Sequence, residues 1–383
     1  MKVLHIGKYF HPSRGGIESF LMDLSHECAS QGAEQGVLVH TAASMEPGQD
    51  TFPHLRYFAR APTLATVSYA PLSPAFPREL ARAIETFKPD LLDLHMPNPS
   101  AFWALFSRPA QKLPWVIHWH ADASGPEFSR SVRLLYPPYR LFEQRLLARA
   151  RAVIATSEPY LTHSPALRRW QEKCRVIPIG LDPSRVNTGG PEETPWQSES
   201  RLRVLAVGRL TPYKGFEILL HALARTRAEL IIAGTGADAA QLRRKARHLG
   251  LSDRVRLTGE VSDASRNALL ASCDLLCLPS LNRAEAFGIS VLESMAAGKA
   301  AAVSKIPGSG LPWLVHDPST GWHFKPGDAA SLALTLNHID ADRDSLMARG
   351  QAARQRFEKH FHISAIARQT LALQKKARGS SVI

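Results

Sequence analysis

Two glutamates eight positions apart, Glu285 and Glu293, frame a Phe-Gly turn in the second half of the chain. The turn follows an apolar, strand-like run at 274–280, and the helix-like pattern after it ends at Gly298. Gly288 lets a ligand approach the backbone, and the free N–H groups at the start of the helix form an anion site. A ligand with a phosphate at that helix start and hydroxyl groups beside the two carboxylates would fit this pattern, and a nucleotide sugar has both groups.

Two cations follow the first strand-like run of the second half. Arg209 and Lys214 lie in a loop that begins at Gly208 and ends at Gly215. Such a loop suits a diphosphate, whose charge must be held and whose leaving oxygen must be stabilised. The plainer alternative is a pair of solvated surface cations.

The first half contains a glycine-rich loop and a histidine cluster. Gly15 and Gly16 precede a helix pattern, but they do not form Gly-x-Gly-x-x-Gly, which argues against a dinucleotide fingerprint. His118 and His120 end an apolar strand, where they would share one face as two metal ligands do. No third ligand stands at an obvious spacing, so no metal is predicted, and a hydrogen-bonded core histidine is the alternative for His118. Asp122 follows this cluster.

These motifs resemble those of the retaining glycosyltransferases of family 4. The sequence from Pro279 to Gly298 matches their Glu-x7-Glu signature without a gap, and the segment 208–215 is similar to their Gly-Arg-x-x-x-x-Lys-Gly motif. The resemblance implies an α/β fold of the GT-B type, in which two Rossmann-like domains with parallel sheets face each other across a cleft.

The resemblance also implies roles for individual residues. The implied catalytic residues are His120, Glu285, Lys214 and Arg209. The implied donor-binding residues are Gly15, Gly16, Arg209, Lys214, Glu260, Val261, Glu285, Phe287, Gly288, Ile289 and Glu293. In these roles the cations bind the pyrophosphate, Glu285 holds sugar hydroxyls, Glu293 takes the ribose, and His120 contacts the sugar. Asp122 is a weaker acceptor-side candidate. The cations and the helix N-terminus replace a metal, so neither a metal nor a cofactor is expected.

A chain of 383 residues suggests about two domains. Apolar runs rich in Val, Ile and Leu alternate with helical patterns, which indicates parallel sheets. The predicted strands are 3–7, 36–41, 91–95, 115–119, 152–156, 175–179, 203–208, 229–233, 254–258, 274–278 and 300–304. We expect an acceptor-side domain at 1–182, a Pro-Gly linker at 183–200 and a nucleotide-sugar domain at 201–357. By resemblance, a helix at about 358–375 returns to the first domain.

Composition limits the cellular setting. No apolar run approaches the roughly 20 residues of a membrane span, and the N-terminus lacks a signal-peptide core, so we expect a cytoplasmic chain. Four scattered cysteines are expected to be reduced structural thiols. The net charge of +13 comes without a nucleic-acid motif. Arginines interleave with aromatic residues across 130–175, which favours peripheral contact with the anionic inner face of the membrane over a merely basic surface.

The donor and acceptor are inferred from resemblance alone. The segments 8–18, 118–122 and 306–310 look most like bacterial enzymes of surface-polysaccharide assembly, in lipopolysaccharide or exopolysaccharide synthesis. Many of these transfer mannose or rhamnose from a GDP-sugar to an oligosaccharide linked to polyprenyl diphosphate. A UDP-sugar donor and a soluble synthase of disaccharides or their phosphates remain alternatives. A non-catalytic nucleotide-sugar-binding module is a more remote alternative, and a nucleic-acid binder is more remote still.

Overall fold

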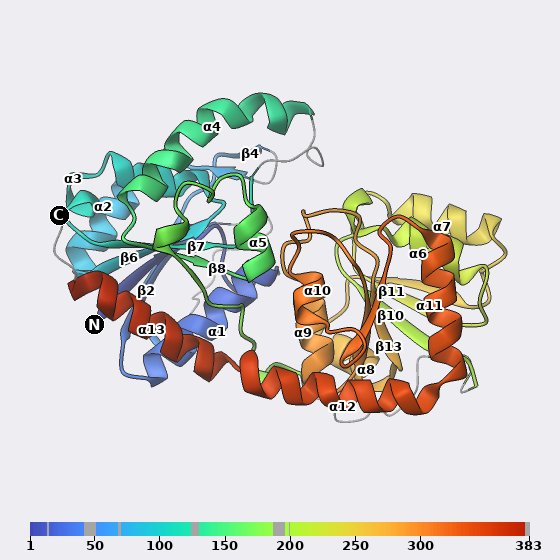
Figure 1. The fold of residues 1–383 in the computed structure, drawn as a ribbon. Helices are drawn as coiled ribbons and strands as arrows, with labels where there is room; N and C mark the ends of the chain where they lie inside the picture. The colour runs from blue at the N-terminus through green and yellow to red at the C-terminus, as the bar shows by residue number, and fades with distance from the viewer. Residues whose placement is uncertain are drawn as a thin grey trace. The chain divides into compact units, whose positions relative to one another are not determined.

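Two α/β units make up the described part of the chain, and each has a central sheet with helices on its faces (Figure 1). This computed structural model describes residues 1–13, 15–41, 51–67, 70–123, 130–186, 196–198 and 200–379. Unit 1 consists of Met1–Gly180 with Ile363–Ile383, and unit 2 consists of Leu181–His362. Most of the predicted linker at 183–200 lies outside the described residues.

A seven-stranded parallel sheet forms the centre of unit 1, in the order β3-β2-β1-β6-β7-β8-β9. Its strands are β1 (Lys2–Ile6), β2 (Glu34–His40), β3 (Leu55–Ala61), β6 (Leu91–Met96), β7 (Trp115–Trp119), β8 (Ala152–Ala155) and β9 (Cys174–Val176), and a small antiparallel pair consists of β4 (Ala65–Val67) and β5 (Ala70–Leu72). The strand order reverses between β1 and β6, and ligands bind at the carboxyl ends of strands at such a switch point.

The helices of unit 1 cover the two faces of this sheet. Those before Gly180 are α1 (Gly16–Ser30), α2 (Phe76–Phe87), α3 (Arg108–Gln111), α4 (Arg130–Arg149), α5 (Glu158–His163) and the 3-10 helices η1 (Pro99–Leu105) and η2 (Gln171–Lys173). Phe87 of α2 packs over Gly36, and Leu21 of α1 packs over Gly7 and Val39 on the opposite face. Because both faces are covered, the central strands are buried along nearly their whole length.

Unit 2 contains a six-stranded parallel sheet in the order β12-β11-β10-β13-β14-β15. Its strands are β10 (Arg203–Val207), β11 (Glu229–Ala233), β12 (Val255–Gly259), β13 (Leu275–Leu278), β14 (Ala300–Ser304) and β15 (Gly321–Phe324). The order reverses between β10 and β13. Each unit therefore has one switch point, and it lies beside the unit's first strand.

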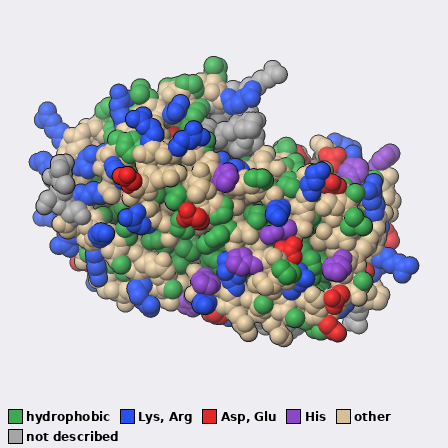
Figure 2. Space-filling view, in the orientation of Figure 1, with side chains coloured by type: hydrophobic (Ala, Val, Ile, Leu, Met, Phe, Trp, Pro, Cys, Tyr) green, Lys and Arg blue, Asp and Glu red, His purple; other side chains and the backbone are tan. Residues whose placement is uncertain are grey.

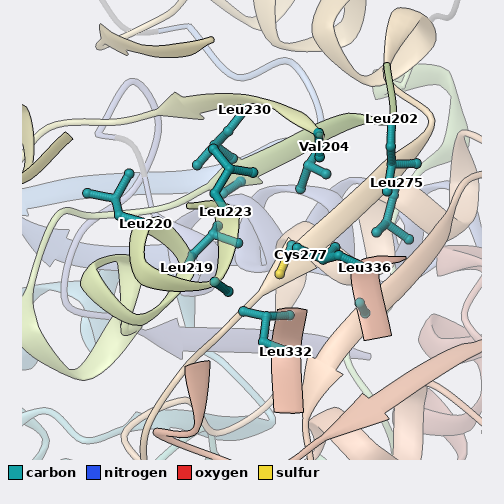
Figure 3. Packing of buried hydrophobic residues seen from close by; sticks show 14 of the residues in the cluster. Leu202, Val204, Leu219, Leu220, Leu223, Leu230, Leu275, Cys277, Leu332 and Leu336 are labelled. Atoms are coloured by element: carbon teal, nitrogen blue, oxygen red, sulfur yellow. The ribbon is translucent and has the colours of Figure 1, made fainter. Parts of the chain in front are cut away.

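One face of the unit 2 sheet carries a large apolar core (Figure 3). Leu219 and Leu223 of α6 (Phe216–Leu223) lie with Leu332 of α11 (Ala329–Ala341) around Val204 and Cys277 of the sheet. Each such leucine is fully buried, and full burial of one leucine side chain stabilises a fold by about 2 kcal/mol. The other helices of the unit are α7 (Ala239–His248), α8 (Asp263–Ser272), α9 (Ile289–Ala296), α10 (Leu311–Leu314) and α12 (Arg343–His360), with the 3-10 helices η3 (Pro183–Arg185) and η4 (Pro212–Lys214).

The last helix belongs to unit 1, although the helix before it belongs to unit 2 (Figure 1). This helix, α13 (Ile363–Gly379), packs against α1, and Gln31 donates a hydrogen bond to the Ser364 carbonyl at 3.0 Å. Its Ile366 lies against Gly180, and its Gln374 reaches Asp93 in β6. The final helix thus covers the face of the unit 1 sheet that α1 covers.

Most predicted strands are present with ends that differ by one or two residues, and a few predictions were wrong. The strand predicted at 175–179 ends at Val176, because Pro178 has no N–H to continue the ladder. The edge strands β3 and β15 were missed. β3 carries two arginines and is only partly buried, and β15 is four residues long and begins with Gly321, so neither has the apolar pattern of a central strand.

All four cysteines, Cys28, Cys174, Cys273 and Cys277, are buried and free of disulfides. None of the helices in the described ranges combines the length and the apolar character that a bilayer crossing requires.

Candidate functional site

Two loops of unit 2 meet at its switch point and bring Lys214 and Glu285 together. Lys214 ends η4, in the loop after β10, and Glu285 lies in the loop between β13 and α9. The Lys214 Nζ atom lies 2.5 Å from Oε2 of Glu285, and the Ser280 hydroxyl donates to the same oxygen at 3.0 Å. Both charged side chains are about nine-tenths buried. A buried ammonium and carboxylate in contact form a charged centre at the carboxyl edge of the sheet.

The electrostatics of this pair favour the charged state of the lysine. Burial lowers the pKa of Lys214, but the adjacent charge of Glu285 and its hydrogen bond outweigh burial, so the pKa lies above its ordinary value. Lys214 therefore remains an ammonium group with three donors, of which Glu285 uses one. The remaining donors suit phosphate oxygens.

Glycines allow these loops to approach one another. Gly215 has φ +68°, and a Cβ atom there would overlap the carbonyl oxygen of Pro279 in the other loop. At Gly208, a Cβ atom would lie 3.2 Å from Cε of Lys214. Close packing of the two loops therefore requires glycine at position 215, whereas the atoms nearest to Gly208 belong to the flexible end of the Lys214 side chain.

The start of α9 contributes backbone donors. Gly288 has φ +99°, and it precedes the first residue of the helix, Ile289. The first N–H groups of a helix have no partner within the helix, and the helix dipole makes this end partly positive. Phe287, which precedes Gly288, is buried. The loop is also fixed by a hydrogen bond from the Ser309 hydroxyl to the Glu285 carbonyl at 2.6 Å.

Glu293 lies inside α9, as the spacing predicts, and is buried. Its Oε1 atom is 3.4 Å from the guanidinium of Arg266 in α8. Arg266 also bonds Asp263 at 3.1 Å. Sequence reasoning missed Arg266, because an arginine in a polar helix has no distinctive neighbours.

The remaining unit 2 candidates lie on loops at the same sheet edge. Arg209 is exposed in the loop after β10, close enough to influence the charge of Lys214. Glu260 and Val261 follow β12, the former exposed and the latter half-buried. The structure brings Lys214 and Glu285 into contact, and it places Arg209, Glu260 and Val261 in loops at the same edge of the sheet.

Unit 1 places its candidates around the carboxyl ends of β1 and β7. Gly15 immediately precedes α1, and Gly16 is its first residue. Asp122 is buried, and its Oδ1 accepts hydrogen bonds from the Trp119 indole at 3.0 Å and the Ser164 hydroxyl at 2.6 Å. These bonds fix the loop after β7, and the acceptor-side role of Asp122 stays a prediction.

The histidine cluster is larger than the sequence suggested. His118 donates from Nδ1 to Oδ1 of Asp93 at 2.8 Å, and the His118 and His95 rings stack with centroids 4.8 Å apart. Burial raises the pKa of Asp93, but His118 and then His5 outweigh burial and hold that pKa below its usual range. This arrangement fits a hydrogen-bonded core role for His118.

His120 lies beside that pair, and only 3% of it is exposed. Its Nε2 is 3.0 Å from Nδ1 of His95, and the ring of Phe20 packs edge-on against it. Sequence reasoning missed His5, His95 and Asp93. The available signal was polar residues inside the apolar strands 2–6 and 91–96, where ordinary parallel strands are continuously apolar.

Comparisons with known proteins find matches in both units. A family described as glycosyl transferases group 1 matches residues 192–356, and a glycosyl transferase 4-like domain matches residues 15–180. The O-antigen chain mannosyltransferase C of Escherichia coli is 29% identical over 374 residues, which cover 94% of both chains. The D-rhamnosyltransferase WbpZ of Pseudomonas aeruginosa is 30% identical over 365 residues, which cover 94% of this chain and 92% of that one.

The fold is similar to that of HepE from Anabaena, solved in complex with UDP-glucose. The TM-score is 0.76 at 22% identity, over 98% of this chain and 100% of HepE. This likeness confirms the predicted GT-B type of α/β fold.

Proposed function

This chain belongs to the group 1 glycosyltransferases, and on that premise we propose that it is a retaining hexosyltransferase acting on a nucleotide sugar. The observation that carries the proposal is the buried contact between Lys214 and Glu285 at the switch point of unit 2. One side of this centre offers ammonium donors to a diphosphate, and the other offers carboxylate oxygens to sugar hydroxyls.

The leaving group is stabilised by charge that the fold already holds in place. Lys214 and Arg209 bind the diphosphate, and the N-terminus of α9 at Gly288 supplies backbone N–H donors. Negative charge develops on the diphosphate as its bond to the sugar breaks. These groups stabilise that charge, so they lower the barrier without requiring a divalent cation. Glu293 takes the ribose hydroxyls, and the backbone around Glu260 and Val261 meets the base.

The sugar is oriented by groups that accept hydrogen bonds. Lys214 and Ser280 both bind Oε2 of Glu285, so its Oε1 is the oxygen for a sugar hydroxyl. His120 contacts another hydroxyl of the sugar. An acceptor hydroxyl then attacks the anomeric carbon on the face from which the diphosphate leaves, so the anomeric configuration is retained.

We assign a GDP-sugar of mannose or rhamnose as donor and an oligosaccharide linked to polyprenyl diphosphate as acceptor. The support is the names of the two curated relatives, a mannosyltransferase of O-antigen chains and a D-rhamnosyltransferase. The HepE complex holds UDP-glucose, which keeps a UDP-sugar as the competing donor.

A transfer assay with the purified chain tests the assignment. GDP-mannose, GDP-rhamnose and UDP-glucose are each incubated with a polyprenyl diphosphate-linked oligosaccharide in the presence of EDTA, and the product is analysed by mass spectrometry and proton NMR. We expect sugar transfer from a GDP-sugar, with the anomeric configuration of the donor kept. Inversion of that configuration would overturn the mechanism, and transfer from UDP-glucose alone would overturn the donor.

We propose that unit 1 has a membrane-binding surface, which brings the enzyme to its lipid-linked acceptor. On α4, Leu134, Leu135 and Leu141 are exposed, with exposed fractions of 79%, 51% and 53%. The same helix exposes arginines, and Figure 2 shows Lys and Arg side chains beside hydrophobic ones over this part of unit 1. The helix packs on η1 through Phe102 and Phe142.

Vesicle sedimentation tests the membrane proposal directly. Each surface Lys or Arg near an anionic bilayer contributes about 1 kcal/mol to binding. The wild type should bind vesicles rich in anionic lipid and should bind neutral vesicles only weakly. Changing Arg133, Arg140 and Arg145 together to Glu should therefore abolish binding to the anionic vesicles. Equal binding of wild type and variant would contradict a role for these arginines in membrane binding, and a wild type that binds no vesicles would favour a soluble synthase.

A further inference from the structure

A continuous row of hydrogen bonds runs across four neighbouring strands of the unit 1 sheet, β2, β1, β6 and β7. It runs from Gln35 in β2 to His5 in β1, then to His95 in β6 and to His120 just after β7. The Gln35 Oε1 atom is 2.8 Å from Nε2 of His5, Nδ1 of His5 is 3.1 Å from Nε2 of His95, and Nδ1 of His95 is 3.0 Å from Nε2 of His120. All four side chains are buried.

The backbone fixes the direction of this row. The Gln35 amide nitrogen donates to the Ala33 carbonyl at 3.1 Å, so the amide oxygen is the atom that faces His5. An amide oxygen only accepts, and His5 must therefore donate from Nε2. In a neutral ring one nitrogen donates and the other accepts, so Nδ1 of His5 accepts from His95.

The same rule carries the direction to the end of the row. His95 donates from Nε2, and its Nδ1 accepts from Nε2 of His120. The proton of His120 is thus on Nε2, and its Nδ1 carries a lone pair. That atom is buried and has no partner among the described residues, whereas a buried polar atom ordinarily has one.

The surroundings keep the three rings neutral. Burial lowers the pKa of His5 and His95, and it lowers the pKa of His120 to about 3, with a smaller contribution from His118. The only carboxylate beside the row within the described residues is Asp93. It is held by His118 at 2.8 Å and by Gln374 of α13 at 2.7 Å, and lies 3.7 Å from His5.

We propose that the row Gln35–His5–His95 fixes the tautomer of His120, so that His120 offers a hydrogen-bond acceptor to its ligand. This deepens the proposed function and rests on it, because it specifies the group that His120 receives. That group is a hydroxyl of the sugar, which donates to Nδ1; a phosphate or carboxylate oxygen, which only accepts, is refused there. Gln35, His5 and His95 are positioning residues.

Two other arrangements of the same atoms give different outcomes. His5, Asp93 and His95 could together hold a metal ion, since one ligand atom of each lies within 4.8 Å of the others. Alternatively, a flipped Gln35 amide, with its NH2 group toward His5 and the proton of His5 on Nδ1, would reverse every bond of the row and place a proton on Nδ1 of His120. Either arrangement contradicts the proposal.

Long-range proton–nitrogen NMR on protein labelled with 15N-histidine reads the tautomer directly. The His120 signals are assigned by their loss in His120→Gln. We expect a protonated Nε2 and an unprotonated Nδ1 for His120 in the free protein at neutral pH. The reverse tautomer, an imidazolium, or stoichiometric metal retained by the purified protein would overturn the proposal. This result does not depend on whether the donor is correctly assigned.

Two variants of His95 then separate positioning from structure. In His95→Gln the amide can donate to His5 and accept from His120, so the tautomer should persist and kcat/KM for the GDP-sugar should stay within about threefold of wild type. In His95→Leu the row is cut, and kcat/KM should fall about tenfold, the effect of one misdirected hydrogen bond.

The exposed His248→Gln in unit 2 serves as the matched control, with an unchanged spectrum for His120. Equal kcat/KM for folded His95→Gln and His95→Leu would contradict the positioning role. If no donor supports turnover, the proposed function fails while the NMR result still decides the tautomer.

Discussion

The two units are built alike, yet their switch points hold different chemistry. In both, a parallel sheet reverses its strand order beside the first strand, and polar side chains gather where it does. Unit 2 places a buried ion pair, Lys214 and Glu285, in the loops after β10 and β13. Unit 1 places a neutral row of hydrogen bonds within β1 and β6 themselves, ending at His120.

The difference shows that one sheet topology can hold two kinds of polar centre, a charged pair in one unit and a row of hydrogen-bonded rings in the other. A fixed positive charge stabilises a phosphate group, and an uncharged acceptor selects a hydroxyl group. The charged pair lies in the loops that follow the strands. The neutral row lies inside the sheet, where an unpaired charge would be costly.

Lys214→Ala should have the largest effect on catalysis. Removal of one group that stabilises developing charge typically lowers the rate by about 10²–10³-fold, and we expect such a loss in kcat. The matched control is Lys245→Ala, a cation on α7 that pairs with half-buried Glu217 in the same unit. Near-normal turnover of Lys214→Ala would remove the contrast between the units.

Glu285→Gln should have the largest effect on stability. Loss of one partner leaves the buried ammonium of Lys214 without compensation, which costs about 3 kcal/mol of unfolding free energy. The double variant Lys214→Met with Glu285→Leu should recover much of that stability and remain inactive. Denaturant unfolding measures both. Equal stability of the single variant and wild type would mean that the pair is not buried in solution.

The neutral histidines of unit 1 predict acid sensitivity. The pKa of His120 is lowered to about 3 from an ordinary value near 6.5, so the unfolded chain binds a proton that the folded chain does not. The contribution of neutral His120 to the free energy of unfolding is therefore fully present above pH 6.5 and is lost as the pH falls toward 3. His120 alone should cost about 2 kcal/mol between pH 7 and pH 5.

Denaturant unfolding at a series of pH values checks this expectation. His120→Gln should flatten the decline, whereas exposed His248→Gln should not change it. A wild-type protein with the same unfolding free energy at pH 7 and pH 5 would show that the row is already charged.

Glu293→Gln should have the smallest effect on catalysis. A carboxylate that binds ribose hydroxyls contributes to ground-state and transition-state binding alike, so KM for the donor should rise about tenfold with kcat nearly unchanged. Steady-state kinetics measure the two constants. A loss in kcat instead would move Glu293 from nucleotide binding into the chemical step.

Much of unit 2 could be predicted from sequence, because its site is local. Glu285, Gly288 and Glu293 lie within nine positions, and the loop 208–215 has its own glycines, so strand, loop and helix patterns place each residue. What the patterns could not give is the contact between the two loops, which depends on the pairing of β10 with β13 across 71 positions of sequence between Lys214 and Glu285.

The site in unit 1 was largely hidden, because its members are far apart in sequence. His5, His95 and His120 are brought together only by the pairing of β1, β6 and β7, and Gln374 arrives from the last helix. His118 and His120 were visible as a pair, but their partners were single polar residues inside buried strands. No spacing rule connects positions 90 residues apart.

Calorimetric titration of GDP in EDTA, with wild type, Lys214→Met and His120→Gln, tests the contrast between the units most directly. We predict that GDP binds the wild type without metal and binds Lys214→Met at least about tenfold more weakly. It should bind His120→Gln as it binds the wild type, because GDP lacks the transferred hexose that His120 is proposed to contact. Undiminished binding to Lys214→Met, or lost binding to folded His120→Gln, would contradict the division of labour between a charged and a neutral switch point.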